Sequence, residues 1–297
     1  MTLKYCLAIA ALLCAPLVLA DDEEIDRALA ADAKGDVDIS NVAGTVNVSG
    51  WDRNEVRVSG TLGEGVERLD FTSEGKRTQI KVVLKKSTHW GDTGGAELSI
   101  RVPAGSRLDV NTVSAEITVK GVSGSQRLQS VSGEISTDVA TEEAEVKTVS
   151  GDIILRGEAA PSVLTLTTVS GNAQASRVAG EVTATTVSGD LNLSLDAITR
   201  ARLRTTSGNL SLRGSLKGDA HVDGETISGD LSFVFKSPLD AEFDIQTFSG
   251  EIDNCFGPKS QSKSEHGPGR ELHFSQGQGT ADVRVNSLSG TISICDR

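Results

Sequence analysis

A short motif, Thr-Val-Ser-Gly-Asp-Ile with close variants, occurs nine times between residues 112 and 292. Its fourth position is Ala115 in the first copy and glycine at 133, 151, 171, 189, 208, 229, 250 and 290 in the others. The successive spacings are 18, 18, 20, 18, 19, 21, 21 and 40 residues. Such self-similarity is the signature of repeat architectures, in which a unit buries its apolar face only by stacking on its neighbours.

Apolar residues alternate with polar ones on both sides of each motif. Leu164, Leu166 and Val169 surround the start of one copy, and Ile153 and Leu155 follow another. A period of two indicates β-strands rather than helices. The Ser-Gly pair in the middle of the motif needs a permissive backbone, so it marks a corner or a tight turn between strands.

The predicted fold is all-β: a single right-handed β-solenoid, a stack of coils of 18–21 residues that lie about 4.8 Å apart. An eight-stranded barrel is the alternative, but it does not require such regular repeats. We expect one domain over 21–297, with a less regular part at 21–105, regular repeats at 106–297 and a loop excursion at 254–270. One inward-pointing apolar column is expected to contain Val149, Val169, Val187 and Ile227.

Residues 1–20 have the pattern of an export signal. Lys4 precedes the apolar run 6–19, and Val18 and Ala20 are small enough for a signal peptidase site. The run is shorter than the roughly 20 residues that a membrane-spanning helix needs. We therefore expect cleavage after Ala20, a periplasmic mature chain and no transmembrane segment after cleavage. Secretion, or a lipoprotein anchored through Cys14, are the alternatives.

The chain is acidic, with a formal net charge of -12 and a sequence pI of about 4.9. Cleavage after Ala20 removes one lysine and leaves 28 basic and 41 acidic residues, a net charge of -13. Such a surface repels phosphate backbones and anionic membranes. Aromatic residues make up only 3% of the chain, too few for nucleobase-stacking platforms. We expect no nucleic-acid partner.

Two cysteines, Cys255 and Cys295, remain after cleavage, and an even number in an exported protein favours a disulfide over a metal site. Each lies five residues after a motif glycine. If the 40-residue spacing holds two coils, they are about 9.6 Å apart, too far to bridge. If it is one long coil with an excursion, they are neighbours. The loop-like composition favours a bond that clamps the terminal coil; two free thiols are the alternative.

Three segments carry a family resemblance: NVAGTVNVSGWDRNEVRVSG at 41–60, LSIRVPAGSRLDVNTVSAEITV at 98–119, and the iterated TVSGDI. Together with VRVNSLSGTISI at 283–294, they resemble a bacterial adhesin-like domain family of unknown function. The resemblance covers 25–297. It implies a stacked β-solenoid in exported or envelope-facing proteins, and it carries over no catalytic residues.

The position after each motif glycine holds a carboxylate in six of the nine copies. Stacked coils would turn these residues into an acidic ladder, which is either a cation column or glycan-facing stripe, or merely a solvated corner. The motif serines and threonines form hydroxyl ladders, and nine equivalent serines argue against one unique nucleophile. The candidate acidic ladder contains Glu116, Glu134, Asp152, Asp190, Asp230 and Glu251.

Two further groups were candidates for chemistry. His89, Trp90 and Asp92 share one glycine-rich loop, which is either a small binding tip or local packing. Polysaccharide lyases also use β-solenoids and need clustered acids with a basic residue. The basic candidates are Arg202, Arg204 and Arg213, near the ladder residues Asp190 and Asp230 in the repeat region.

The sequence favours a non-catalytic exported envelope protein whose rigid solenoid binds or scaffolds a partner, either an envelope protein or a glycan. A carbohydrate-active enzyme on the same fold is the alternative, and a secreted adhesin is a third. We expect no metal and no cofactor. The sequence leaves the oligomeric state open.

Overall fold

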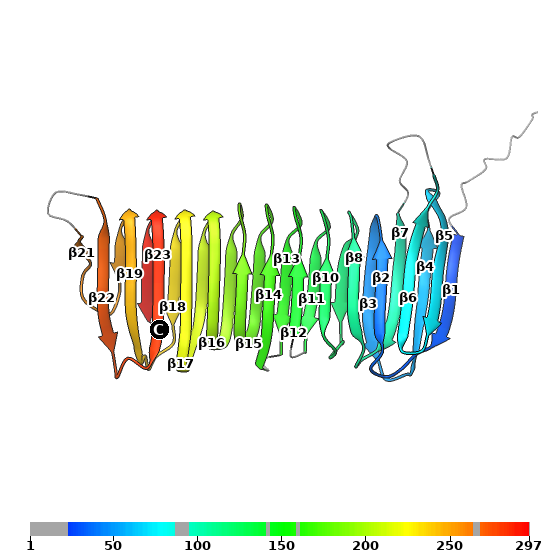
Figure 1. Ribbon diagram of the computed structural model, residues 1–297, viewed down its shortest axis with the longest axis horizontal. Coiled ribbons are helices and arrows are strands. Elements are labelled where there is room, and N and C mark those ends of the chain that lie inside the picture. The colour runs from blue at the N-terminus through cyan, green and yellow to red at the C-terminus, as the bar shows by residue number, and fades with distance from the viewer. Residues whose placement is uncertain (1–22, 87–94, 141–142, 159–160, 264–267, 297) are drawn as a thin grey trace, which may run out of the picture.

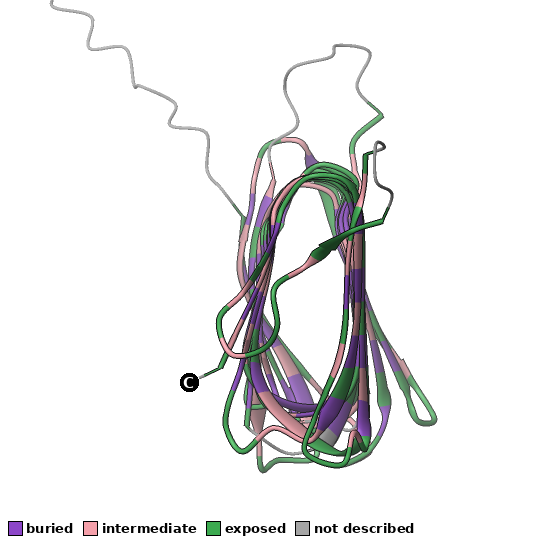
Figure 2. Ribbon diagram, turned by 90° about the vertical axis from the view of Figure 1, so that its left-hand side faces the viewer, coloured by how far each residue is buried: buried purple, intermediate pink, exposed green. Residues whose placement is uncertain are grey.

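The computed structural model describes residues 23–86, 95–140, 143–158, 161–263 and 268–296. In these residues, strands and connecting turns wind into coils that stack along one long axis (Figure 1). Seen along that axis, the coils superimpose into a flattened ring with two long sides (Figure 2). The all-β solenoid fold is confirmed. The right hand of the coil stays a prediction.

Each long side of the ring is a sheet. The first sheet contains, in spatial order, β5 (Val66–Glu74), β6 (Arg77–Leu84), β2 (Asp36–Asn41), β8 (Arg107–Thr112), β10 (Gln126–Gln129), β12 (Glu143–Lys147), β14 (Pro161–Thr167), the second halves of β15 (Ala173–Thr185), β16 (Leu191–Ser207) and β17 (Leu210–Ser228), then β23 (Ala281–Ser289), β19 (Ala241–Ser249), β22 (Arg270–Gln276) and β21 (Gln261–Ser262).

The second sheet contains, in spatial order, β1 (Glu23–Ala30), β4 (Glu55–Leu62), β7 (Ala96–Pro103), β3 (Gly44–Trp51), β9 (Glu116–Lys120), β11 (Ile135–Val139), β13 (Ile153–Gly157), the first halves of β15, β16 and β17, then β18 (Leu231–Phe235), β24 (Ile292–Asp296) and β20 (Ile252–Asn254). In the regular repeats the chain passes from the first sheet to the second at the motif, which forms one corner of the ring.

The pairing between coils is parallel and keeps equivalent residues side by side. Ile135 pairs with Ile153, and Leu191 pairs with Leu210. The inward side chains of both sheets are Val, Ile, Leu and Ala, and they fill one continuous core between the sheets. Burying each large apolar side chain contributes roughly 1.5–3 kcal/mol, so the stack rather than any single coil is the stable unit.

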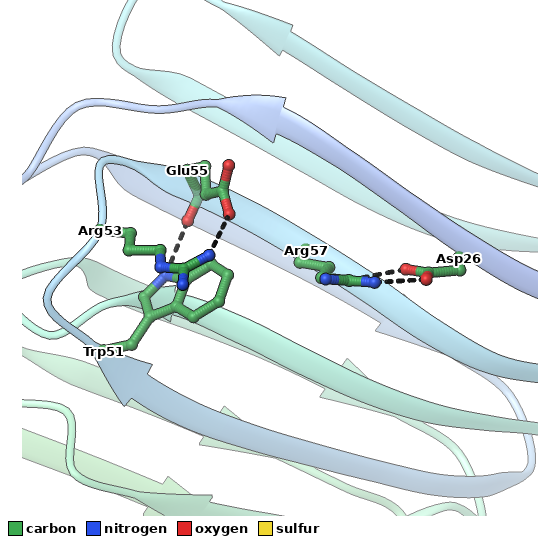
Figure 3. Close-up of polar contacts among 5 residues, drawn as sticks. All are labelled: Asp26, Trp51, Arg53, Glu55 and Arg57. Carbon is green, nitrogen blue, oxygen red and sulfur yellow. Dashed lines mark hydrogen bonds and ion pairs between the residues drawn. The ribbon is translucent and has the colours of Figure 1, made fainter.

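The N-terminal end is closed by antiparallel strands. β4 pairs antiparallel with both β1 and β7, and β5 pairs antiparallel with β6. There Arg57 forms an ion pair with Asp26, which lowers the pKa of that carboxyl through the hydrogen bond from the guanidinium (Figure 3). The Trp51 Nε1 donates to the Glu55 carbonyl oxygen at 2.9 Å, and the Arg53 guanidinium lies 5.2 Å from the Trp51 ring centroid. The Trp51 contacts hold the β3–β4 connection in place, and the Asp26–Arg57 pair joins β1 to β4.

The last coil along the chain is not the last coil of the stack. β23 lies between β17 and β19, and β24 lies between β18 and β20 (Figure 1). In chain order, the outer strands β19 and β20 come first, and antiparallel β22 then pairs with the edge of β19. The final coil comes last in the chain but lies one position inside β19 and β20. The strands at both ends of the solenoid thus lie out of sequence order, and at the C-terminal end β22 covers the edge of β19.

The predicted disulfide joins Cys255 to Cys295, whose Cα atoms are 4.9 Å apart, so the bond and the one-coil spacing are confirmed. Cys295 lies in β24, and Cys255 directly follows the outer strand β20. The bond therefore clamps the coil that carries β20. The C-terminal coil is not the terminal coil of the stack, because it is inserted one position inside the end.

The predicted inward column is also wrong. Val149, Val169, Val187 and Ile227 are exposed, whereas the residue before each of them is buried. The physical reason is the strict alternation of a strand. Counting in steps of two from the buried Leu164 and Leu166 reaches Thr168 and skips Val169.

Candidate functional site

The motif corner exposes a row of large apolar side chains. These are the residues at the second motif position, and their exposed fractions run from 39% at Val169 to 58% at Phe248. Thr206 occupies the same position in one copy and interrupts the row. We call this row the ridge; it contains, in spatial order, Val113, Val131, Val149, Val169, Val187, Ile227, Leu288 and Phe248.

Backbone hydrogen bonds between neighbouring coils align the ridge. The Val131 N–H donates to the Val113 carbonyl oxygen and the Val169 N–H to that of Val149, both at 3.2 Å. Farther along, the Ser207 N–H donates to the Val187 carbonyl oxygen at 2.8 Å. At about 4.8 Å for each of eight steps, the ridge is a straight line of about 38 Å.

In eight of the nine copies glycine stands beside the ridge, because neighbouring coils approach closely there. A Cβ atom on Gly151 would lie 2.0 Å from the Gly133 carbonyl oxygen, and one on Gly229 would lie 2.1 Å from that of Gly208. Any larger residue would push the coils apart. The predicted role of the Ser-Gly pair as a corner is confirmed, and close packing is its cause.

A shallow open pocket of about 560 Å³ lies where Thr206 interrupts the ridge. Val187, Ile227 and Leu288 border it on the ridge side, and Arg204 and Glu225 border it on the first sheet. The Arg204 Nε and a carboxylate oxygen of Glu225 are 3.0 Å apart, so these two charges are paired. The pocket therefore has apolar side chains on the ridge side and a pair of opposite charges, Arg204 and Glu225, on the side of the first sheet.

A buried column of hydroxyl groups lies directly under the ridge, and it has two forms. In the earlier coils the hydroxyl accepts a hydrogen bond from the motif glycine: the Gly171 N–H lies 3.0 Å from the Thr168 Oγ1. In the later coils the glycine N–H bonds to the next coil, as Gly208 does to the Ser228 carbonyl oxygen at 3.1 Å. The hydroxyls left without a partner there are those of Thr186, Thr205, Thr226, Thr247 and Ser287.

The candidate acidic ladder is a real row of stacked, exposed residues. Main-chain hydrogen bonds place it in the order Glu116, Glu134, Asp152, Asn172, Asp190, Asn209, Asp230, Thr291 and Glu251. From Asp152 onward each carboxylate is followed by a neutral residue. Insertion of the final coil puts Thr291 between Asp230 and Glu251, so the carboxylates in this stretch are two coils apart, which limits like-charge repulsion.

The ladder side chains bond to the backbone of the next coil. A carboxylate oxygen of Asp152 accepts the Asn172 N–H at 2.7 Å, and one of Asp190 accepts the Asn209 N–H at 2.8 Å. The amide oxygen of Asn172 serves the Asp190 N–H in the same way at 3.0 Å. Asp and Asn therefore tie successive coils together at the corner, which is the structural role that the sequence left open.

A comparison with protein-family models identifies the family of this chain. The family model described as Toastrack DUF4097, a domain of unknown function, matches residues 35–238. This chain belongs to the Toastrack family. The match covers the N-terminal end and the repeats as far as β18, so the Toastrack corner with its ridge and ladder lies largely inside it. No curated protein matches the chain.

Two solved structures match the Toastrack chain at low sequence identity. One is a "putative cell adhesion protein" from Clostridium sporogenes, at 12% identity and a TM-score of 0.26, covering 93% of this chain and 100% of that one. The other is a "putative adhesin" from Bacteroides fragilis, at 12% identity and a TM-score of 0.42, covering 93% of this chain and 98% of that one.

The basic residues considered for a lyase site do not converge in the Toastrack chain. Arg202 and Arg204 lie on the outer side of the first sheet, where they face Asp223 at 3.8 and 3.9 Å. Arg213 lies in the first half of β17, which belongs to the second sheet. The structure does not bring these three arginines together with the ladder carboxylates.

The histidines within the described residues lie on the first sheet beside carboxylates. His221 faces Asp282 at 3.7 Å, and His273 faces Asp244 at 3.1 Å. The candidate loop with His89, Trp90 and Asp92 lies outside the described residues, as does the segment 1–20 that is expected to be an export signal. Within the part of the chain that the structure describes, no helix has the length and apolar character needed to cross a membrane.

Sequence reasoning missed the ridge as a surface because it placed these valines in the core. The signal was present, since the motif threonine and not the valine continues the alternation from Leu164 and Leu166. The structure thus replaces a predicted core column by a candidate interaction surface.

Proposed function

We propose that this Toastrack chain is a non-catalytic, exported envelope protein whose rigid solenoid binds a partner through the ridge, in the manner of an adhesin or a scaffold. The export signal expected at 1–20 supports the exported location. The stacked coils, joined by backbone hydrogen bonds and by the Asx ladder, supply a stiff support for a binding surface.

The observation that carries this proposal is the row of eight large apolar side chains exposed along one corner. Single exposed apolar residues are ordinary on a protein surface, but a contiguous apolar patch marks an interaction site. A polar side chain at the second motif position would fit the same outward direction. The fold itself therefore does not require the apolar ridge.

Site-specific photocrosslinking in cells that produce the protein tests this proposal. A photoreactive phenylalanine analogue replaces Phe248 on the ridge or, as the matched control, Ser232 on the outer side of the second sheet. We expect adducts from position 248 that excess wild-type protein suppresses, and few from position 232. Equal yields at the two positions, or none at position 248, would show that the ridge is not the binding surface.

A further inference from the structure

We infer that the C-terminal part of the ridge binds a basic amphipathic helix of a partner protein. This inference rests on the proposed binding function of the ridge and names the occupant. The part concerned consists of Val187, Thr206, Ile227, Leu288 and Phe248. It holds the three most exposed side chains of the ridge, Ile227, Leu288 and Phe248, and it borders the pocket.

The spacing of the ridge favours a helix over an extended peptide. The apolar stripe of a helix advances by about 5.3 Å per residue of the stripe, whereas same-face side chains of a strand advance by about 6.7 Å. Against a ridge step of about 4.8 Å, over the four steps from Val187 to Phe248 a helix drifts by about 2 Å and a strand by about 7.6 Å. A helix therefore stays in register over these coils, and an extended strand does not.

The backbone at the corner gives the same answer. Its hydrogen bonds run from coil to coil, as between the Ser188 N–H and the Val169 carbonyl oxygen at 2.8 Å, so the ridge is not the edge of a sheet. An extended peptide gains its affinity from backbone bonds to such an edge. Recognition at the ridge depends on side chains, which is how an amphipathic helix binds.

The pocket at Thr206 supplies a seat for one side chain of that helix. Val187, Ile227 and Leu288 border the hollow beside Thr206 on the ridge side. A leucine or phenylalanine of the helix would enter this gap as a knob enters a hole. Anchors buried in such pockets dominate the energy of interfaces.

Charge complementarity points to a basic partner. On three of these five coils, the residue three positions past the ridge is a carboxylate: Asp190, Asp230 and Glu251 line the other side of the ridge. The whole chain carries a net charge of -12. Lysine or arginine residues beside the apolar stripe of the helix would meet this ladder. A second copy of the chain would bring the same negative charges, and an anionic membrane would be repelled as well.

The test uses a synthetic 18-residue helix with a leucine stripe and lysine flanks, labelled for fluorescence anisotropy, against the purified chain 21–297. We expect saturable binding that weakens about tenfold in Ile227→Ser/Leu288→Ser and in Thr206→Trp, which fills the pocket. The matched control, Val113→Ser/Val131→Ser at the far end of the ridge, should bind as the wild type does. Equal binding by all variants would overturn the inference.

Two further peptides separate helix recognition from charge attraction. A scrambled peptide of the same composition and a version with glutamate flanks should each bind at least about tenfold more weakly. If the scrambled peptide binds equally well, the inference is wrong.

Sedimentation of the chain alone tests the remaining occupant. A concentration-dependent dimer that Ile227→Ser/Leu288→Ser abolishes would make a second copy the occupant, overturning the helix while the proposed function of the ridge stands. A monomer at all concentrations supports the inference. Failure of the crosslinking at position 248 would instead remove the proposed function itself.

Discussion

The sheets and the motif corner of this solenoid differ in which side chains they bury: the sheets bury apolar side chains, and the corner buries a polar one and exposes an apolar one. In the sheets, apolar residues such as Leu166 are buried and their neighbours face solvent. At the corner, only two and three residues later, Thr168 is buried and Val169 is exposed. The comparison teaches that the apolar residues of the repeat do not all belong to the core, because one in each of eight motif copies lies at the surface. The buried threonine has a structural reason, because its hydroxyl accepts the Gly171 N–H, whereas Val169 leaves 39% of its surface open to solvent.

The largest expected effect comes from the same substitution on the two sides of this boundary. Leu166→Asp places an unpaired carboxylate in the core and should cost several kcal/mol, about 4 or more, so that the chain misfolds or melts far earlier. Val169→Asp places it on the ridge and should cost about 1 kcal/mol or less. Thermal unfolding followed by circular dichroism measures both. Similar losses in the two variants would contradict the exposed position of the ridge.

A second comparison concerns the two forms of the buried hydroxyl column. Thr168→Val removes the acceptor of the Gly171 N–H and should destabilise the chain by about 1–3 kcal/mol. Thr205→Val removes a buried hydroxyl that has no partner and should leave stability unchanged or raise it by about 1 kcal/mol. Urea unfolding of both variants gives the signs. A loss in Thr205→Val as large as that in Thr168→Val would show that the later hydroxyls have partners after all.

The ladder permits a third, smaller comparison at one position. Asp190→Asn keeps an oxygen that accepts the Asn209 N–H, so its free energy of unfolding should differ little from that of the wild type. Asp190→Ala removes the acceptor and should cost about 0.5–1.5 kcal/mol. Chemical unfolding at pH 7 resolves the two. If Asp190→Asn were the more damaging change, the charge rather than the hydrogen bond would be what the ladder contributes.

Much of this fold could be predicted because the repeat period and the alternation are local patterns. The stacked coils, the corner at the Ser-Gly pair and the alignment of the ladder all follow from them. The ridge could also have been predicted from the sequence, since counting in steps of two from the buried Leu166 leads to Thr168 and leaves Val169 on the exposed side. Hydrophobicity alone gave the opposite and wrong assignment for Val169.

The ends could not be predicted from the repeat, because they break it. The insertion of β23 and β24 inside β19 and β20 depends on which strands pair, and equivalent motif copies at Ser287 and Thr247 compete for the same neighbour, Thr226. Nothing local distinguishes them. The long 40-residue spacing indicated an excursion, and the disulfide requires the coils that carry Cys255 and Cys295 to be neighbours. Neither determines whether the final coil lies inside or outside the coil that carries Cys255.

The smallest effect is expected at Asp240. Unlike the ladder carboxylates, each described above with one backbone hydrogen bond, Asp240 accepts hydrogen bonds from several backbone N–H groups at once. Asp240 accepts the Gln278 N–H at 2.7 Å and the Thr280 N–H at 3.1 Å, and so holds the turn that leads into the inserted β23. The hydrogen bond from the Thr280 backbone, with those from Gln278 and Gly279, lowers the pKa of Asp240. A carboxyl whose pKa is lower in the folded chain stabilises it at pH values above the unfolded pKa of about 4, and that contribution disappears as the pH falls further. The melting temperature of Asp240→Asn should therefore lie below that of the wild type at pH 7, and the difference should close as the pH falls below about 4. A difference that persists unchanged at pH 2 would show that the carboxylate charge does not hold this turn.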